Sequence, residues 1–223
     1  MWNLQGFGSQ LLIGTAATVQ LAACALAVGT AFGLVGAALQ FSGWKLLRAV
    51  GYAYAAIVRG VPDLLIVFMV YFGGTVTLGA IAGRYVDVNA FAAGTFALAL
   101  SFGAFASEVF RGAIEAVPRG QVEAAKALGF SGPKALFAVI APQALRIALP
   151  PYGNQAIILL KQTSLVSIIG CDELMRKAAE ASGATREPFT MYLAAAAIYL
   201  LLTSVSTLLL ELSEHRLARH ART

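Results

Sequence analysis

The chain has 223 residues, of which 59% are hydrophobic and only 12% are charged. Soluble domains carry about 25% charged residues, so a soluble core of this size could not bury so much apolar surface, and lipid is the expected solvent. The formal net charge of +5 does not indicate nucleic-acid binding, because the basic residues lie between apolar blocks and form no basic run.

Five segments are predicted to cross a membrane, since a spanning helix needs about 20 mostly apolar residues. In chain order they are Leu11–Phe41, Leu64–Gly83, Val88–Ser107, Ile147–Leu160 and Pro188–Leu210. The helix of the second span can begin earlier, near Gly51. We expect the first span to stay in the mature chain, because no charge lies between Met1 and Trp44 and a signal peptide needs a positive n-region.

The fourth predicted span is the weakest, because its apolar run covers only 14 residues before Lys161 interrupts it. Apolar character then resumes over Gln162–Cys171. A helix that carries a lysine in mid-span should turn this side chain toward protein or water rather than lipid. The alternative is a re-entrant segment.

The basic residues predict the orientation, because cytoplasmic loops carry an excess of lysine and arginine. Five spans place the termini on opposite sides. With the C-terminus inside, ten basic residues lie in the cytoplasm and four lie outside. We therefore expect an outer N-terminal segment at residues 1–10, a membrane domain at 11–212 and a cytoplasmic tail at 213–223. The outer loop 172–187 is polar, and it either contacts a soluble partner or is merely solvated.

The stretch Glu115–Pro142 is the most informative part of the chain. Pro118 suits the start of a helix and Gly129 its end, and Gln121–Leu128 between them is rich in helix formers. This helix of roughly ten residues would be about 15 Å long, which is too short to cross a membrane. Ser131 then suits the N-cap of a second short helix with a proline in its first turn.

The surfaces of this predicted helix pair are too apolar to be left in water. The apolar residues that crowd the turn are Val122, Ala125, Leu128, Phe130, Leu136 and Phe137. A short apolar helix on the cytoplasmic side is typical of insertion into a groove of a partner protein. An amphipathic segment on the membrane surface would have the same composition. The residues alone leave both readings open.

The spacing Glu123-Ala124-Ala125, three residues and then Gly129 resembles the EAA loop of the permease subunits of bacterial ATP-binding-cassette (ABC) importers. The family pattern continues after nine residues with Ile-x-Leu-Pro. This chain has Val139-Ile140-Ala141-Pro142 there, which keeps the apolar character and the proline. The resemblance extends over most of the chain, from about Leu11 to Glu211.

This resemblance implies an all-α integral membrane protein with five transmembrane helices and the type I ABC importer transmembrane fold over residues 11–212. The loop 113–146 would then contain a coupling helix that docks in a cleft of the ATPase. The residues implied to couple the chain to the ATPase are Glu123, Ala124, Ala125, Gly129 and Pro142. The alanines would permit close approach of helices, and the glycine would permit the turn.

The partners follow from the same resemblance. The chain has no Gly-x-x-x-x-Gly-Lys-[Ser/Thr] segment, so it has no P-loop, and it contains no catalytic or metal-binding motif. We expect two separate ABC ATPase subunits that use ATP and Mg²⁺, and no cofactor on this chain. A second permease chain, either a paralogue or a second copy, and a periplasmic or lipid-anchored amino-acid-binding receptor would complete the assembly in the bacterial inner membrane.

The resemblance also implies a substrate class. Three segments, which begin at Arg59, Ser107 and Leu160, look like the polar-amino-acid branch of the family. The stretch Glu187-Pro188-Phe189 is similar to subunits that serve histidine, arginine, lysine, ornithine or opines. The chain is therefore expected to move a polar, basic amino acid by alternating access.

The charged residues in or near the predicted spans are Arg59, Asp63, Glu108 and Lys161. An ionised group at bilayer depth costs several kcal/mol unless it is paired or hydrated. These residues either line the substrate path or form structural pairs, and helical spacing favours a pair of Arg59 with Asp63. Thr163 and Ser164 either line the same path or bond between helices.

Three rival functions are weighed against the importer. An ion-coupled secondary transporter is expected to carry inverted repeats with discontinuous helices and to need no short cytoplasmic helix pair. A non-transporting scaffold has no need of charges inside its spans. A membrane enzyme needs a reactive constellation, and the sequence has none.

Overall fold

The computed structural model describes residues 4–219, with side chains over residues 4–215. The outermost parts of the predicted N-terminal segment and C-terminal tail, including His220 and Arg222, lie outside the described residues. All regular structure within the described range is helical. Five helical segments in it are long and apolar enough to cross a membrane. The chain is thus an all-α membrane protein with five spanning helices, as predicted.

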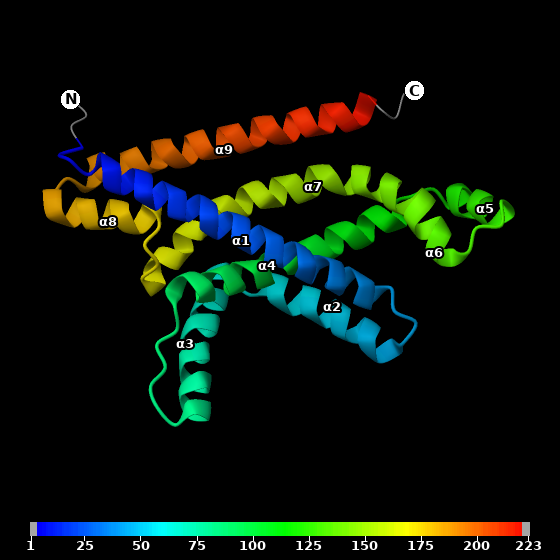
Figure 1. Ribbon diagram of the computed structural model, residues 1–223, viewed down its shortest axis with the longest axis horizontal. Coiled ribbons are helices and arrows are strands. Elements are labelled where there is room, and N and C mark those ends of the chain that lie inside the picture. The colour runs from blue at the N-terminus through cyan, green and yellow to red at the C-terminus, as the bar shows by residue number, and fades with distance from the viewer. Residues whose placement is uncertain (1–3, 220–223) are drawn as a thin grey trace.

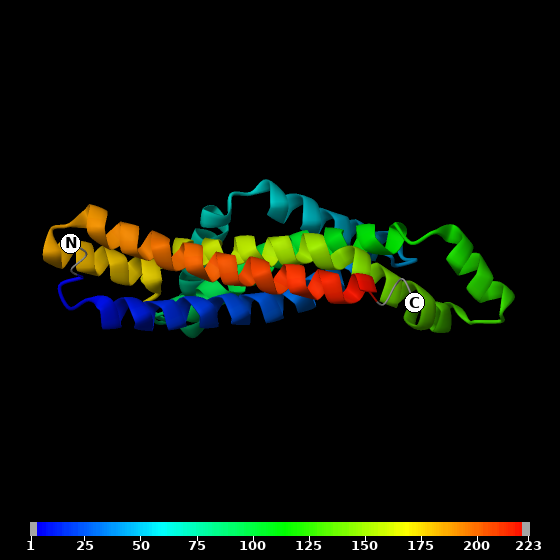
Figure 2. The same ribbon diagram turned by 90° about the horizontal axis from the view of Figure 1, so that it is seen from above.

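Most of the long helices run roughly along the long axis of the molecule (Figure 1). The elements are α1 (Gly8–Gln40), α2 (Lys45–Gly60), α3 (Asp63–Ala82), α4 (Ala90–Glu115), α5 (Arg119–Ala127), α6 (Gly132–Ala135), α7 (Ala141–Gln162), α8 (Leu174–Thr185) and α9 (Pro188–Arg219). Helices α5 and α6 lie beyond the ends of α4 and α7, at the same end of the molecule as the C-terminus (Figures 1 and 2). Helix α8 lies at the opposite end, beside the N-terminus.

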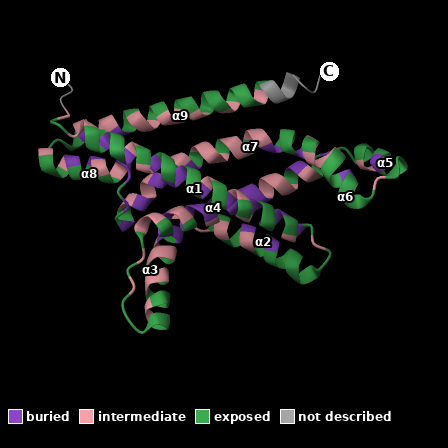
Figure 3. Cartoon of the chain, viewed as in Figure 1, coloured by how far each residue is buried: buried purple, intermediate pink, exposed green. Residues whose placement is uncertain are grey.

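The packing of α1 against α4 forms the centre of the molecule, where the buried residues concentrate (Figure 3). A Cβ atom added to Gly33 of α1 would lie 2.6 Å from the Cβ of Ala106, and one added to Gly29 would lie 2.9 Å from the carbonyl oxygen of Ala99. Small residues let two helices approach closely inside a membrane, where van der Waals packing drives association. We call this contact the α1–α4 seam.

The second predicted span is the single helix α3, whereas its expected earlier start near Gly51 is wrong, because a separate helix, α2, ends at Gly60 before Pro62. Val61 has extended backbone angles, φ −100° and ψ 134°, because a proline disfavours the helical conformation of the residue before it. Helix α2 ends there, and α3 begins at Asp63 and projects away from the other helices (Figure 1). Helix α3 packs against α4 and against the 3₁₀ turn η2 (Thr163–Ile169), and most of its apolar surface is exposed.

The fourth span is longer than predicted. A single helical run of 38 residues covers Gly132–Ile169, so both the 14-residue estimate and the re-entrant alternative are wrong. The expected second short helix, α6, is the first turn of this run. A π-helical turn, η1 (Leu136–Ile140), joins α6 to α7 just before Pro142. Beside this proline the Gln143 side chain donates a hydrogen bond to the carbonyl oxygen of Val139 at 2.9 Å.

The segment 172–187, expected as an outer loop, contains the helix α8. Glu173 is its N-cap residue, and the Glu173 carboxylate accepts a hydrogen bond from the backbone N–H of Arg176 at 2.8 Å. The third and fifth spans also extend further than predicted, to Glu115 and Arg219. In both spans the apolar run ends before the helix does. The polar residues that follow it still form backbone hydrogen bonds and so continue the helix.

Gly33→Ala is expected to destabilise the α1–α4 seam, because the added methyl group would meet backbone-anchored atoms that cannot swing away. Overpacking costs about 1–3 kcal/mol, which corresponds to a fall of roughly 2–10 °C in the thermal unfolding midpoint. Gly73→Ala on α3 is the matched control, since its added Cβ would meet nothing within 4 Å. Equal midpoints for the two variants would show that the seam is not closely packed.

Candidate functional site

The predicted coupling residues lie together on α5, the short helix between α4 and α6. Pro118 precedes its first residue, as expected. Ala125 is buried, whereas Glu123 and Ala124 are exposed. Glu123 forms no ion pair with Lys126 in the described part of the chain, although their spacing would allow one. The acidic side chain therefore points into solvent and is available to a partner.

Helix α5 ends in a sharp turn whose backbone N–H groups are hydrogen-bonded. Gly129 has φ +77°, in the left-handed region where a side chain is disfavoured. The backbone N–H of Gly129 donates to the carbonyl oxygen of Lys126 at 2.9 Å, and that of Phe130 donates to Ala125 at 3.0 Å. This pair of bonds is the Schellman motif, which ends a helix with a glycine. The Lys134 ammonium lies 4.6 Å from the centre of the Phe130 ring and braces the turn from the other side.

Helix α5 is connected to both α4 and α7 by short links. Three residues separate it from α4, and the middle one, Val117, is buried against Ala113 of α4 and Ala144 and Ala148 of α7. Pro142, the last predicted coupling residue, lies at the start of α7 beyond the π turn. Leu128 and Phe137 are about three-quarters exposed, so an apolar surface remains open beside Glu123. The loop thus presents one acidic and several apolar side chains on a rigid turn.

Glu108 of α4 connects the three helices α1, α2 and α4. Its carboxylate accepts hydrogen bonds from the Gln40 amide at 2.9 Å and from the Arg111 guanidinium at 2.7 Å. The Arg59 guanidinium of α2 lies 3.8 Å from it and 5.2 Å from the centre of the Phe105 ring. We call these residues the Glu108 clamp, and it ties α1, α2 and α4 together.

Asp63 does not pair with Arg59, although their spacing predicted it. Its two carboxylate oxygens accept hydrogen bonds from the Ser101 hydroxyl of α4 and from the Gln162 amide of α7, the latter at 2.6 Å. The break at Val61 and Pro62 separates the two charged residues onto different helices, so the helical i, i+4 geometry does not apply. Asp63 therefore holds the start of α3 against the centre of the bundle.

The three polar residues predicted at the end of the fourth span, Lys161, Thr163 and Ser164, have different surroundings. Thr163 is fully buried and donates to the Leu160 carbonyl oxygen at 2.7 Å, so it lines no open path here. Lys161 and Ser164 instead line a cavity of about 320 Å³ between α7, η2, α8 and α9, with Met175, Tyr192, Ala195, Ala196 and Tyr199. Two of the predicted path residues, Lys161 and Ser164, therefore line this cavity.

Glu173 is a buried carboxylate that sequence reasoning missed. It is fully buried and accepts hydrogen bonds from the hydroxyls of Thr18 on α1, at 3.2 Å, and Tyr199 on α9, at 2.9 Å. The Thr18 hydroxyl also accepts from the backbone N–H of Leu174 at 3.1 Å. The signal in the sequence was the presence of Thr18 and Tyr199 inside apolar spans, but nothing in it paired them with Glu173.

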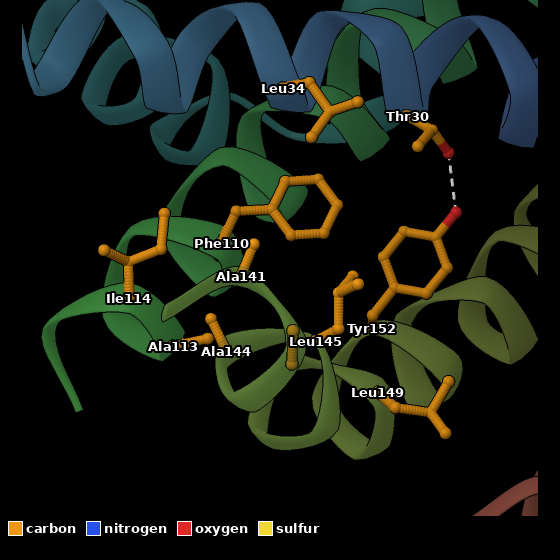
Figure 4. A pocket seen from close by; sticks show the side chains of 11 residues that line it. Thr30, Leu34, Phe110, Ala113, Ile114, Ala141, Ala144, Leu145, Leu149 and Tyr152 are labelled. Carbon is orange, nitrogen blue, oxygen red and sulfur yellow. Dashed lines mark hydrogen bonds between the residues drawn. The ribbon is translucent and has the colours of Figure 1, made fainter. Parts of the chain in front are cut away.

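A second cavity, of about 360 Å³, lies between α1, α4 and α7 (Figure 4). Phe110, Leu145 and Leu149 are among its mostly aliphatic and aromatic lining. The hydroxyls of its two polar residues, Thr30 and Tyr152, are 2.6 Å apart and satisfy each other. The lining therefore offers no charge and no free polar group to a polar ligand.

The sequence and the fold are similar to those of known transport proteins. The family described as binding-protein-dependent transport system inner membrane component matches residues 15–219. The nopaline transport system permease protein NocQ of Agrobacterium fabrum is 44% identical over 211 residues, which cover 92% of this chain and 89% of that protein. The arginine ABC transporter permease protein ArtQ of Escherichia coli is 38% identical over 222 residues, covering 92% and 93%. A crystal structure of an amino acid ABC transporter with histidines matches with a TM-score of 0.85 and 35% identity, over 93% of this chain and 94% of that chain.

Glu108→Gln is expected to weaken the Glu108 clamp, because it removes the charge that neutralises Arg111 and Arg59. A hydrogen bond to a charged group contributes about 1.5–3 kcal/mol. Glu115→Gln is the matched control, since Glu115 pairs with the same Arg111 at 2.7 Å but its side chain is 51% exposed, against 23% for Glu108. Exposed pairs contribute about 0.2–1 kcal/mol. Thermal unfolding should show the larger loss for Glu108→Gln, and equal losses would contradict the clamp.

Proposed function

The chain belongs to the family of binding-protein-dependent transport system inner membrane components and is a permease subunit of an ABC amino-acid importer, and we propose that α5 couples it to two separate ATPase subunits. The observation that carries this proposal is the position of α5. It is a short helix held outside the bundle, with Glu123, Ala124 and Leu128 exposed. A short helix of this kind suits the groove of a partner protein.

The connections of α5 supply a route for movement. ATP binding would draw the two ATPase subunits together and shift the α5 of each permease. The rigid turn at Gly129 would pass this shift to the continuous run of α6, η1 and α7, while Val117 would pass it to α4. The Glu108 clamp would carry the α4 displacement to α1 and α2. Alternating access would follow from the relative movement of these two groups of helices.

The described chain leaves apolar helix surface for a second permease chain. Helix α3 projects from the bundle, and Met69, Val76 and Ile81 on it are more than two-thirds exposed. Exposed apolar surface of this kind marks a contact with lipid or with another protein. A paralogue or a second copy of this chain would cover it.

We place the N-terminus outside and the C-terminus in the cytoplasm. The end of the molecule that carries α5 also carries the basic residues Lys45, Arg119 and Lys126, in agreement with the excess of basic residues on the cytoplasmic side. The opposite end carries α8, which a periplasmic or lipid-anchored receptor would meet. ATP and Mg²⁺ would be used by the ATPase subunits, and this chain would have no enzymatic activity of its own.

The proposed substrate is a basic amino acid or an opine. The similar permeases NocQ and ArtQ are named for nopaline and arginine transport. Both compounds contain a guanidinium group and an α-carboxylate, so one site can recognise the shared groups. Among the polar residues predicted for a path, Lys161 and Ser164 line a cavity and are available to it.

Gly129→Pro and Glu123→Arg are expected to abolish uptake. Proline cannot adopt φ +77° and removes the N–H that bonds to Lys126, and the arginine reverses the exposed charge. ATPase stimulation by the loaded receptor should be lost as well, while membrane insertion persists. Gly129→Asn is the control, because asparagine tolerates the left-handed conformation. Normal uptake by both disruptive variants would reject the coupling role of α5.

The substrate proposal is tested in proteoliposomes that contain the assembled permease and ATPase subunits, with receptor outside and ATP inside. We expect uptake of radiolabelled arginine that stops without ATP or receptor. Unlabelled nopaline and lysine should compete, whereas glutamate should not, because it lacks a cationic side-chain group. Preferential competition by glutamate would overturn the basic substrate and leave the coupling role intact.

A further inference from the structure

The apolar cavity between α1, α4 and α7 lies at the end of the bundle that carries α5. Its walls include Phe110 and Ile114 from the last turns of α4, together with Ala144 and Leu145 from the start of α7. These two helix ends lead into the links to α5 and α6 (Figure 1). All its lining residues belong to segments that are long and apolar enough to cross a membrane. The cavity therefore lies within the membrane domain, in the leaflet on the α5 side.

The interior of this cavity suits a hydrocarbon chain and no polar ligand. The Thr30 hydroxyl donates a hydrogen bond to the carbonyl oxygen of Leu26 at 2.6 Å. The Tyr152 hydroxyl, 2.6 Å from that of Thr30, must then be the donor in their shared bond, because a hydroxyl has one hydrogen to give. Both hydrogens are thus used, and the other lining residues have apolar side chains (Figure 4). The volume of about 360 Å³ is within the range of small-molecule sites.

The cavity opens to the surface of the bundle beside α1 and α7. Leu34 on α1 and Leu145 on α7 both line it, and they are 56% and 64% exposed. Exposed apolar side chains on a spanning segment contact lipid or another protein. A lipid chain that contacts these two leucines can enter the cavity from the bilayer without passing through water.

Arg146 places a positive charge beside this opening. It directly follows Leu145, and it is three residues before Leu149, which also lines the cavity and is its neighbour on the helix surface. The Arg146 side chain is exposed and belongs to none of the ion pairs formed within residues 4–215. A guanidinium group in a spanning segment needs an anion or water, and its long side chain can extend toward the membrane surface. The bilayer itself supplies phosphate there, which arginine binds through two parallel N–H groups.

We propose that this cavity binds one acyl chain of a phospholipid from the leaflet on the α5 side, with the Arg146 guanidinium on the lipid phosphate. The apolar lining and the adjacent positive charge are complementary to the two ends of this one molecule. A free phosphate would leave the cavity unfilled, and an uncharged hydrocarbon would leave Arg146 unpaired.

The bound chain would lie against the weakest part of α7. Pro150 and Pro151 interrupt the backbone hydrogen bonding of this helix, and the adjacent residues Leu149 and Tyr152 line the cavity. An acyl chain between α4 and α7 would fill the space into which α7 could bend. The lipid would therefore stabilise the arrangement of helices described here relative to one in which the cavity has closed.

The test measures binding of dioleoylphosphatidylglycerol to the purified permease and ATPase assembly in detergent by native mass spectrometry. Arg146→Gln should weaken binding about tenfold, as expected for the loss of a charge-assisted contact. Ala141→Leu, which fills part of the cavity, should weaken it by a similar factor. The family pattern has leucine at this position, so the fold accommodates the larger side chain. Lys45→Gln and Ala53→Leu are matched controls on the exposed surface of α2, and both should bind the lipid as the wild type does.

Unchanged lipid affinity in either Arg146→Gln or Ala141→Leu would overturn the proposal. Displacement of the lipid by glycerol 3-phosphate would also overturn it, because Arg146 would then bind phosphate without the chain. Dissociation of the permease pair by either variant at unchanged lipid affinity would show that a side chain of the neighbouring permease occupies the cavity instead. Retention of the lipid against glycerol 3-phosphate, with weaker binding in both variants, is the result that we expect.

Discussion

The hydrocarbon interior of a bilayer offers no hydrogen-bond partner, so every polar group within the spans must be satisfied by the protein or by enclosed water. This chain meets the requirement at three carboxylates. Glu108 joins α1, α2 and α4, Asp63 joins α3, α4 and α7, and Glu173 joins α1, α8 and α9. Each carboxylate thereby determines which helices must move together, because separating them would leave a charge unpaired at membrane depth.

These carboxylates and the α1–α4 seam act on the same helices. Helix α1 is held by Glu108 at one end, by Glu173 at the other and by glycine-mediated contact between them. Helix α7 differs, because Pro150 and Pro151 interrupt its hydrogen bonding and a π turn precedes it. Kinks in helices arise at such positions. A displacement of α5 would therefore translate α4 as part of a rigid unit and bend the run of α7.

The parts of the structure that could be predicted are those set by interactions close in sequence. The five spans follow from hydropathy over about 20 residues, and the ends of α5 follow from Pro118 and Gly129. The partner of Asp63 could not be predicted, because the spacing rule assumes a continuous helix and the chain breaks at Pro62. The burial of Glu173 depends on α1 and α9, which are far away in sequence. The fourth span was underestimated because backbone hydrogen bonding, not hydropathy, decides where a helix ends.

The division between paired and unpaired charges also separates structural roles from roles in binding. A charge that is satisfied within the chain is costly to release, so Arg59, Asp63 and Glu108 are poorly suited to bind and release a substrate in each cycle. Lys161 carries no such cost, since the described chain gives it no counter-ion to lose. The intramembrane charges that shape the bundle and Lys161, which lines a cavity, therefore have different physical tasks, although hydropathy alone ranks them alike.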